Sequence, residues 1–570
     1  MSKDVDPSDL LALCKRRGFI WPSFEIYGGV AGMYDYGPLG CALKNNIVEV
    51  WRSIYKGREG FVEIDSETVN PREVFKASGH VDEFADKITY CSKCQAPFRA
   101  DHLVKEFYDN PDILSPAELD KAFVDHGVKC PECGGDLGPV DEFNLMFKTN
   151  IGPGSNRIGY LRPETAQGIF VNYNNLYRYN REKLPLGVIQ TGRSYRNEIA
   201  PRQGMIRMRE FNQMEVELFV DPEDKGWVRY DAIKDERITL VPNTTEQAVE
   251  MTIDEAVSKG IIANKVLAYF VNTTKQLLLR LGIDPARLRF RQHLEDEMAH
   301  YAADCWDAEV LLSYGWMEIT GIADRGCWDL SRHAQFSGTD MTHFKKFDEP
   351  VEMEVDKIKA KHKLLGPRFK AKAKDIAAAI EAKDPEEARS GSITVMCDGE
   401  SVELTDEFYE IVRVKEKVSG KRVVPHVIEP SHGLDRIFYS VLEQSYDYDE
   451  KEDYTVLRLK PEVAPIKVGV FPLMEKDGLD GFAMGLYETL QRGGIASVYD
   501  GSGTIGKRYA RMDEVGTPYC ITVDYETLEG DLKGTVTIRD RDSKEQKRIP
   551  ADKAGEIVRG LMSGADFKNI

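Results

Sequence analysis

Two short segments between residues 186 and 220 carry side chains that suit the handling of a nucleotide. Arg196 and Glu198 stand two residues apart, and Arg207, Phe211 and Glu215 follow after a loop marked by Pro and Gly. Guanidinium groups bind phosphate oxygens, an aromatic ring stacks on a purine, and carboxylates hold an ammonium group or an exocyclic amine. The residue types and their spacing therefore indicate a site that activates a substrate with a nucleotide.

An antiparallel hairpin is the element expected to position these groups, with strands at 186–195 and 210–220. Side chains alternate between the two faces of a strand. The apolar face must meet a core, and it holds Met214, Val216, Leu218 and Val220. The opposite face holds Phe211, Gln213, Glu215 and Glu217, so it forms the floor of the site together with Arg207 and Arg209. The alternative is a solvated hairpin whose charges pair with one another.

A second motif, Glu429-Pro-Ser431-His-Gly433-Leu-Asp435-Arg436, lies far downstream. The β-branched run Arg422 to Ile428 predicts a strand before it, and apolar residues at helical spacing predict a helix from Leu434. Gly433 then stands at a strand-to-helix turn, where backbone N–H groups favour an anion. Arg436, in the first helical turn, can reach a terminal phosphate.

Together the two segments resemble the second and third signature motifs of class II aminoacyl-tRNA synthetases. Further words resemble the glycyl-tRNA synthetases of the homodimeric archaeal and eukaryotic type, and the likeness runs from about Phe19 to Met562. These words are Tyr34-Asp-Tyr-Gly-Pro-Leu-Gly40, Arg162-Pro-Glu-Thr-Ala-Gln-Gly168, Arg289-Phe-Arg-Gln-His293, Ala299-His-Tyr301 and Glu429-Pro-Ser431. The resemblance implies an α+β fold: an antiparallel-sheet catalytic core with insertions, followed by a C-terminal α/β anticodon-binding domain.

The same resemblance implies a glycine–tRNA ligase, which uses ATP to form glycyl-adenylate and then transfers glycine to the 3′ end of tRNA(Gly). It assigns catalysis to Arg196 and Arg436. It assigns ATP binding to Arg196, Asn197, Glu198, Arg207, Met208, Phe211, Glu318, Ile319 and Arg436, and glycine binding to Glu164, Glu215, Glu429, Pro430 and Ser431. It also implies Mg²⁺ as the cofactor that accompanies ATP, and a homodimer.

Two other functions remain open at this stage. A class II synthetase for another small amino acid would share the nucleotide residues, but the words around Arg162 and Glu429 argue against it. A non-catalytic tRNA-binding or polymerase-accessory paralogue should have lost Arg196, Phe211 or Arg436, all of which are present. Every other amino acid is larger than glycine, so steric rejection suffices for specificity and we expect no editing domain.

Glu318 is a polar residue within an apolar strand-like run, where an unpaired buried carboxylate would be costly. Magnesium bound to ATP phosphates would explain it, and the family resemblance favours this role. A buried salt bridge, with Arg325 as the partner, is the alternative.

Two C-x-x-C pairs, Cys91/Cys94 and Cys130/Cys133, suit tetrahedral thiolate ligation of a structural zinc ion. Free or vestigial thiols are the alternative. The other six of the ten cysteines are scattered singly, which is typical of a reducing compartment and predicts a cytoplasmic protein. No apolar run approaches the ~20 residues of a membrane span.

The formal net charge of −19 argues against general nucleic-acid binding but leaves room for a local basic track. Lys357 to Lys374 holds eight Lys or Arg and no acid, within a predicted helical insertion that could contact the tRNA. After Pro461, alternating strands and helices predict a small α/β domain. The Gly-rich run Gly501 to Lys507 lacks the spacing of a phosphate-binding loop.

The predicted organisation alternates core segments and insertions. We expect the N-terminal part of the core with the dimer motif at 1–90, a zinc-binding insertion at 91–140, core with the second motif at 141–225, a mainly helical insertion and return to the core at 226–300, core at 301–345, an insertion contacting the tRNA acceptor stem at 346–420, core with the third motif at 421–460, and the anticodon-binding domain at 461–570.

Overall fold

The computed structural model describes residues 6–108, 110–153, 157–201, 204–294, 298, 302–397, 400–449 and 454–570. The chain divides into two compact units. Thr342–Val424 forms the smaller unit, and the segments on either side of it form the larger one. No helix within the described residues is long and apolar enough to cross a membrane.

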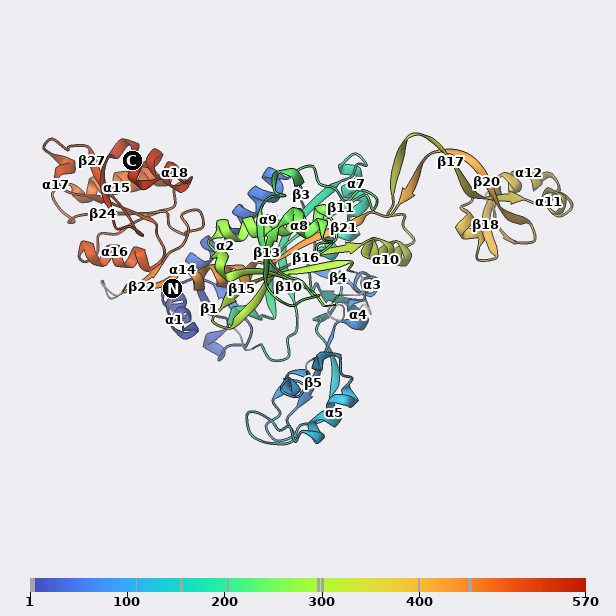
Figure 1. Ribbon diagram of the computed structural model, residues 1–570, viewed down its shortest axis with the longest axis horizontal. Helices are drawn as coiled ribbons and strands as arrows, with labels where there is room; N and C mark the ends of the chain where they lie inside the picture. The colour runs from blue at the N-terminus through green and yellow to red at the C-terminus, as the bar shows by residue number, and fades with distance from the viewer. Residues whose placement is uncertain are drawn as a thin grey trace. The chain divides into compact units, whose positions relative to one another are not determined.

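A nine-stranded sheet is the framework of the larger unit (Figure 1). Its neighbours run antiparallel, except for the parallel pairs β10–β3 and β12–β14. In spatial order the strands are β13 (Val249–Thr252), β12 (Arg237–Val241), β14 (Leu288–Gln292), β15 (Asp304–Leu312), β16 (Gly315–Gly326), β21 (His426–Gly433), β11 (Glu210–Val220), β10 (Leu186–Tyr195) and β3 (Val62–Glu63).

The predicted hairpin is confirmed, because β10 and β11 pair antiparallel from Leu186 opposite Phe219 to Tyr195 opposite Glu210. The predicted apolar face is also confirmed: Met214, Val216 and Leu218 have no exposed surface. They belong to one core with residues of helices α2 (Pro38–Arg52), α9 (Lys265–Leu281) and α14 (Leu434–Ser445), which lie alongside the sheet in Figure 1. The helices cover this face, so the polar face is left for a site.

One predicted element near the edge of the sheet is wrong in part. The mainly helical insertion expected at 226–300 contains β12 and β13, which extend the main sheet, before helices α8 (Ile253–Ser258) and α9. Short edge strands carry too few residues for a clear period, which explains the error. At the other edge, β3 is followed by a second short strand, β4 (Val69–Pro71), which joins a different sheet.

The predicted strand Arg422 to Ile428 is also wrong, because it spans two strands. β20 (Tyr409–Val423) ends before Pro425, and β21 begins at His426 and runs on to Gly433. Proline lacks the N–H that continues a ladder, so it separates the two strands. As a result Glu429 and Ser431 lie within β21 itself, an interior strand between β16 and β11.

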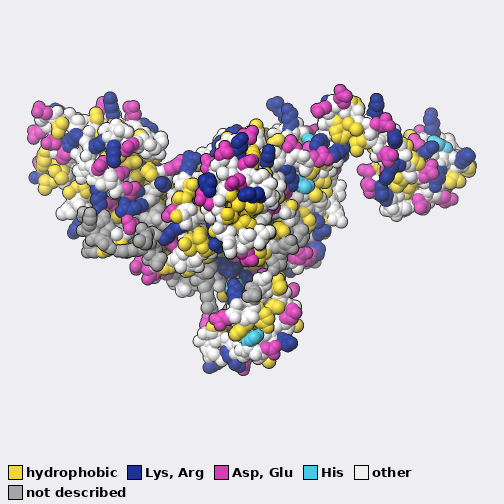
Figure 2. Space-filling model, viewed as in Figure 1, with side chains coloured by type: hydrophobic (Ala, Val, Ile, Leu, Met, Phe, Trp, Pro, Cys, Tyr) yellow, Lys and Arg dark blue, Asp and Glu magenta, His cyan; other side chains and the backbone are white. Residues whose placement is uncertain are grey.

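The smaller unit is built on the long hairpin of β17 (His343–Ala360) and β20. Its core joins helices α11 (His362–Phe369), α12 (Ala373–Glu381) and α13 (Pro385–Ala388) to strand β18 (Ser392–Cys397), which pairs with β19 (Glu400–Thr405). The basic segment was expected to be helical throughout, but Lys357 to Ala360 end strand β17. Lys357 pairs with Glu416 at 2.6 Å, and Figure 2 shows dark blue and magenta side chains interspersed on the visible face of this unit.

The predicted C-terminal α/β domain is confirmed as a five-stranded sheet, in which β24 pairs in parallel with β25 and β26. Helices α15 (Leu479–Arg492) and α18 (Ala554–Met562) share one core with the sheet, and α16 (Ile505–Glu514) contributes to another. The strands in order are β25 (Ser497–Tyr499), β24 (Val468–Pro472), β26 (Tyr519–Val523), β27 (Thr535–Asp540) and β28 (Gln546–Pro550).

Candidate active site

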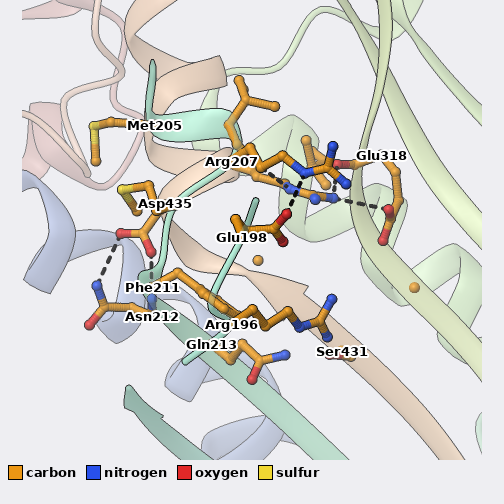
Figure 3. A pocket seen from close by; sticks show the side chains of 16 residues that line it. Arg196, Glu198, Met205, Arg207, Phe211, Asn212, Gln213, Glu318, Ser431 and Asp435 are labelled. Carbon is orange, nitrogen blue, oxygen red and sulfur yellow. Dashed lines mark hydrogen bonds and ion pairs between the residues drawn. The ribbon is translucent and has the colours of Figure 1, made fainter. Parts of the chain in front are cut away.

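A cavity opens on the polar face of β11, β16 and β21 (Figure 3). Both motifs and the segment around Glu318 contribute to its wall. The lining residues are Arg196, Glu198, Met205, Ile206, Arg207, Met208, Phe211, Asn212, Gln213, Glu318, Ile319, Gly321, Ser431, Gly433, Asp435 and Arg436.

Arg196 lies between two aromatic rings at this cavity. Its guanidinium carbon is 5.4 Å from the ring centroid of Phe211 and 5.3 Å from that of Phe84, and its Nε donates to the carbonyl of Pro163 at 3.4 Å. Figure 3 shows the side chains of Arg196 and Phe211 running side by side. The rings hold the guanidinium in one direction without neutralising its charge, which suits it to bind an anion.

Two further arginines are paired with carboxylates across the cavity. Arg207 Nε lies 3.0 Å from Glu198 Oε2, and Arg436 Nη1 lies 2.9 Å from Glu318 Oε2. Arg436 also donates to the backbone carbonyls of Ile206 and Glu318, at 3.1 and 2.8 Å. Both arginines can exchange a carboxylate for the phosphate oxygens of a ligand, because both line the cavity.

The expectation that Glu318 is buried, with Arg325 as its alternative partner, is wrong. The side chain of Glu318 is 49% exposed, and Arg436 holds the pKa of its carboxyl below the usual range. Alternation within β16 did not reveal that a helix more than a hundred residues away supplies the partner. Arg325 is buried elsewhere and pairs with Asp329 and Glu429.

Asp435 anchors the floor of the cavity to the N-terminal segment. Its Oδ1 accepts from Asn212 Nδ2 at 3.0 Å, and its carboxylate also accepts from the Asn212 backbone N–H and the Tyr36 hydroxyl. Sequence reasoning did not single out Asn212, which lies one residue after Phe211. The only sequence signal for it was that the motifs containing Tyr36 and Asp435 both resemble the same family.

Several predicted residues contact the cavity differently or not at all. Met208 and Ile319 line it, whereas Asn197 does not, and the Asn197 backbone N–H donates to Leu145. Arg209 was expected on the floor but does not line the cavity. Instead it donates to the carbonyls of Ala31, Glu198 and Ile199 and so holds the loop between the two strands. The word Ala299 to Tyr301 lies outside the described residues.

Glu215 lies just beyond the cavity and receives three hydrogen bonds. Ser431 Oγ and Gln213 Nε2 donate to its Oε1 at 2.9 and 3.1 Å, and Thr165 Oγ1 donates to its Oε2. Its side chain is buried, and burial together with the nearby charge of Glu164 raises the pKa of its carboxyl. Thr165 was not predicted as a site residue, although it directly follows Glu164 in the Arg162–Gly168 motif.

Glu164 and Glu429 bring two more carboxylates to the same place. Glu164 stands between β9 (Ile158–Leu161) and α6 (Ala166–Val171) and accepts from Gln167 at 2.8 Å. Burial opposes its ionisation, but His80, 3.7 Å away, holds the pKa of its carboxyl below the usual range.

Glu429 accepts from Arg325 Nη1 at 2.7 Å, and Arg325 also binds Asp329 with two hydrogen bonds. Burial, opposed by Arg325 and reinforced by Glu215 and Glu164, raises the pKa of Glu429 to about 8. Pro430 alternates to the other face of β21, opposite Ile322, so it shapes the strand and does not reach this cluster. The acidic cluster therefore holds more carboxylates than cations, which suits an ammonium group.

The four predicted zinc ligands lie together in a small lobe with strands β5 (Ala85–Tyr90), β6 (Pro97–Arg99), β7 (Asp141–Asn144) and helix α5 (Pro116–Asp125). Their sulfur atoms all lie within 4.8 Å of one another. Backbone N–H groups of Cys94 and Lys93 help lower the pKa of Cys91 to about 6. A Cβ on Gly135 would lie 3.1 Å from the sulfur of Cys91, so the loop closes tightly around the thiols. This donor set fits a tetrahedral zinc ion.

Comparisons with known proteins agree with this geometry. Residues 154–445 match the tRNA synthetase class II core domain (G, H, P, S and T), and residues 467–561 match an anticodon binding domain. The fold and the site thus define a class II tRNA synthetase.

Three archaeal proteins narrow the family, and each is named glycine–tRNA ligase. The protein of Methanothrix thermoacetophila is 51% identical over 97% of this chain and 96% of its own length. The protein of Methanocaldococcus jannaschii is 49% identical over 98% and 99%, and that of Archaeoglobus fulgidus is 49% identical over 97% of each chain. The chain belongs to the glycine–tRNA ligase family.

Proposed function

We propose that this protein activates glycine with ATP and transfers the glycyl group to tRNA(Gly). One observation carries the proposal. Ser431 and Gln213 line the same cavity as Arg196, Arg207 and Arg436. Both side chains also donate to Glu215, which belongs to the acidic cluster with Glu164 and Glu429. An ammonium held by the cluster therefore places the carboxylate of a small amino acid beside Arg196, where a bound nucleotide would present its phosphates.

The arginines supply the chemistry of the first step. The amino-acid carboxylate attacks the α-phosphorus of ATP, and pyrophosphate leaves, so negative charge must be neutralised on both sides of the reacting atom. We assign Arg196 to the α-phosphate and the carboxylate, and Arg207 and Arg436 to the β- and γ-phosphates. Phe211 stacks on adenine, and Glu198 accepts from its exocyclic amine. Attack needs no covalent enzyme intermediate, because positioning and charge neutralisation suffice.

Glu318 fits Mg²⁺ as a hard oxygen ligand at the rim of the cavity, since about half of its side chain is exposed. When bound with ATP, the ion would neutralise phosphate charge. Arg436, no longer paired with Glu318, would then be available to the phosphates.

The acidic cluster supports glycine as the amino acid. We assign Glu164, Glu215 and Glu429 to the ammonium. Buried Thr165 and Gln167, which donate to Glu215 and Glu164, are assigned to close the space where a larger side chain would extend. Specificity then arises from steric rejection of every larger substrate.

The remaining roles follow from the other parts of the chain. We assign the anticodon of the tRNA to the C-terminal domain, and its acceptor stem to the basic segment Lys357 to Lys374 of the smaller unit. We also propose a homodimer through the N-terminal part of the core, which the exposed apolar side chains of Ile26 (88%) and Tyr27 (85%) support. None of the ten cysteines, all of which are among the described residues, forms a disulfide bond, which fits a cytosolic enzyme.

Amino-acid-dependent ATP–pyrophosphate exchange with each of the twenty amino acids tests the proposal. We expect exchange with glycine alone, together with glycylation of tRNA(Gly). Equal exchange with alanine or serine would refute the assignment of glycine as the specific amino acid. No exchange with any amino acid would favour an accessory tRNA-binding protein.

A further inference from the structure

Glu217 is a buried carboxyl group to which the proposed reaction gives no role. It lies on β11, two residues beyond Glu215 and on the same face of the sheet. The residue has no exposed surface, and neither of its carboxyl oxygens has a hydrogen-bond partner within the described residues. An unpaired buried carboxylate costs several kcal/mol, so the group must meet a partner or carry a proton.

The sheet places Glu217 beside Glu429. The pairing of β11 with β21 runs from Glu215 opposite Ser431 to Leu218 opposite Ile428, which sets Glu217 directly opposite Glu429. Opposite residues on one face have Cβ atoms roughly 5 Å apart, within reach for two carboxyl groups to share a hydrogen bond.

The surroundings of Glu217 do not allow both members of this pair to be ionised. β10 contributes only the apolar Val188 opposite Glu217. Burial and the nearby charge of Glu429 raise the pKa of Glu217 well above its usual value. The other titratable groups that face the pair are Glu215 on β11, Arg325 on β16, Asp329 on α10 (Trp328–Ser337), and Glu164 before α6. Arg325 is permanently charged, but its guanidinium group is already bound to Asp329 and Glu429.

We propose that Glu217 is a positioning residue of the glycine site: it keeps its proton when Glu429 ionises and donates it as a hydrogen bond to that carboxylate. Ionised Glu429 is thereby fixed between two donors, Glu217 and Arg325, and carries the charge that receives the ammonium. This inference rests on the proposed role of Glu429 in binding glycine.

Removal of the donated hydrogen bond should be visible in the pH dependence of glycine use. A bond to the charged form of Glu429 lowers its pKa and opposes the effect of burial. In Glu217→Leu the bond is lost, so the pKa of Glu429 rises. The acid limb of kcat/KM for glycine should then move up by about one pH unit, and KM for glycine near pH 7 should rise about tenfold. KM for ATP should stay within a factor of about two.

Glu217→Gln distinguishes positioning from direct binding. The amide of glutamine can still donate to Glu429 but cannot ionise, so this variant should recover most of what leucine removes. Glu443→Leu is the matched control, because Glu443 is also buried but lies on α14, where it accepts from Ser313 at 2.6 and 2.8 Å. It should lower the melting temperature without moving the acid limb.

The measurement is glycine-dependent ATP–pyrophosphate exchange between about pH 6 and 9. Equal losses in Glu217→Gln and Glu217→Leu would mean that an ionised Glu217 binds the ammonium itself, and an unmoved acid limb in Glu217→Leu would remove any link to Glu429. Either result overturns the inference while wild-type exchange leaves the proposed function intact. Absence of glycine-dependent exchange in the wild type would end both.

Infrared difference spectroscopy covers the case in which the leucine variant does not fold. Near pH 7 the wild type minus Glu217→Gln spectrum should contain the carbonyl band of a protonated carboxylic acid, and glycine should shift that band. A spectrum with only carboxylate bands refutes a protonated Glu217.

Discussion

Glu215→Gln separates the glycine site from the nucleotide site. In the native protein one carboxylate oxygen accepts from Ser431 and Gln213, and the other accepts from Thr165. A glutamine can keep its oxygen toward the first two donors and turn its NH2 group to Thr165, whose hydroxyl rotates to accept. The substitution therefore preserves the network and removes one negative charge, with a loss of stability of about 1 kcal/mol or less.

The lost charge should appear in the binding of the ammonium. A hydrogen bond to a charged group is worth about 1.5–3 kcal/mol, and every 1.4 kcal/mol is a factor of ten. Because the ammonium keeps its contacts with Glu164 and Glu429, we expect KM for glycine to rise roughly 10- to 100-fold. KM for ATP should change less than about twofold, since the arginines and Phe211 are untouched.

The assay is ATP–pyrophosphate exchange with each substrate varied at saturating levels of the other. Glu443→Gln, a change at a buried carboxyl outside the site, serves as the control. A large rise in KM for ATP with normal glycine kinetics would assign Glu215 to the nucleotide and refute this account of the pocket.

Three further predictions test the site and its surroundings. Arg196→Ala should lower the exchange rate by about 100-fold or more without a change in thermal stability, and exposed Arg193→Ala should not; near-normal exchange in the first variant would contradict the phosphate role. Elemental analysis should find one zinc per chain, and Cys130→Ser should lose it; a metal-free wild type with four reactive thiols would exclude the site. Unfolding curves should show glycine stabilising the protein increasingly from about pH 6 to about 8, because the ammonium favours ionised Glu429. Without glycine, Glu429 should contribute a loss of stability as pH rises from about 4.5 to about 8, since the folded state holds its proton longer; a glycine effect independent of pH would contradict this.

The parts of the site that depend on one strand or one turn could be predicted from sequence. The bounds of β10 and β11 and the buried face of Met214 and Val216 followed from alternation, which needs no knowledge of the partners. The helix from Leu434 was also predicted, because its apolar residues recur at helical spacing within one element.

The parts that depend on contacts between distant segments could not be predicted. Alternation alone did not pair Glu318 with Arg436, or Arg325 with Glu429 and Asp329, because those pairs exist only after β16, β21 and two helices meet. The bulge between Asp324 and Gly326 also interrupts the alternation of β16 just where Arg325 turns to the acidic cluster.

The position of β21 has a consequence for synthesis on the ribosome. β21 lies in the middle of the sheet, between β16 and β11, yet about 100 residues separate the end of β16 from its start. At roughly 5–20 residues per second, a nascent chain must keep two half-sheets, each with an open inner edge, apart for about 5–20 seconds. Unpaired edges of this kind invite association with other chains. The strand that joins the two half-sheets is therefore the last one to be synthesised. A nascent chain that ends before Arg436 cannot assemble the cavity.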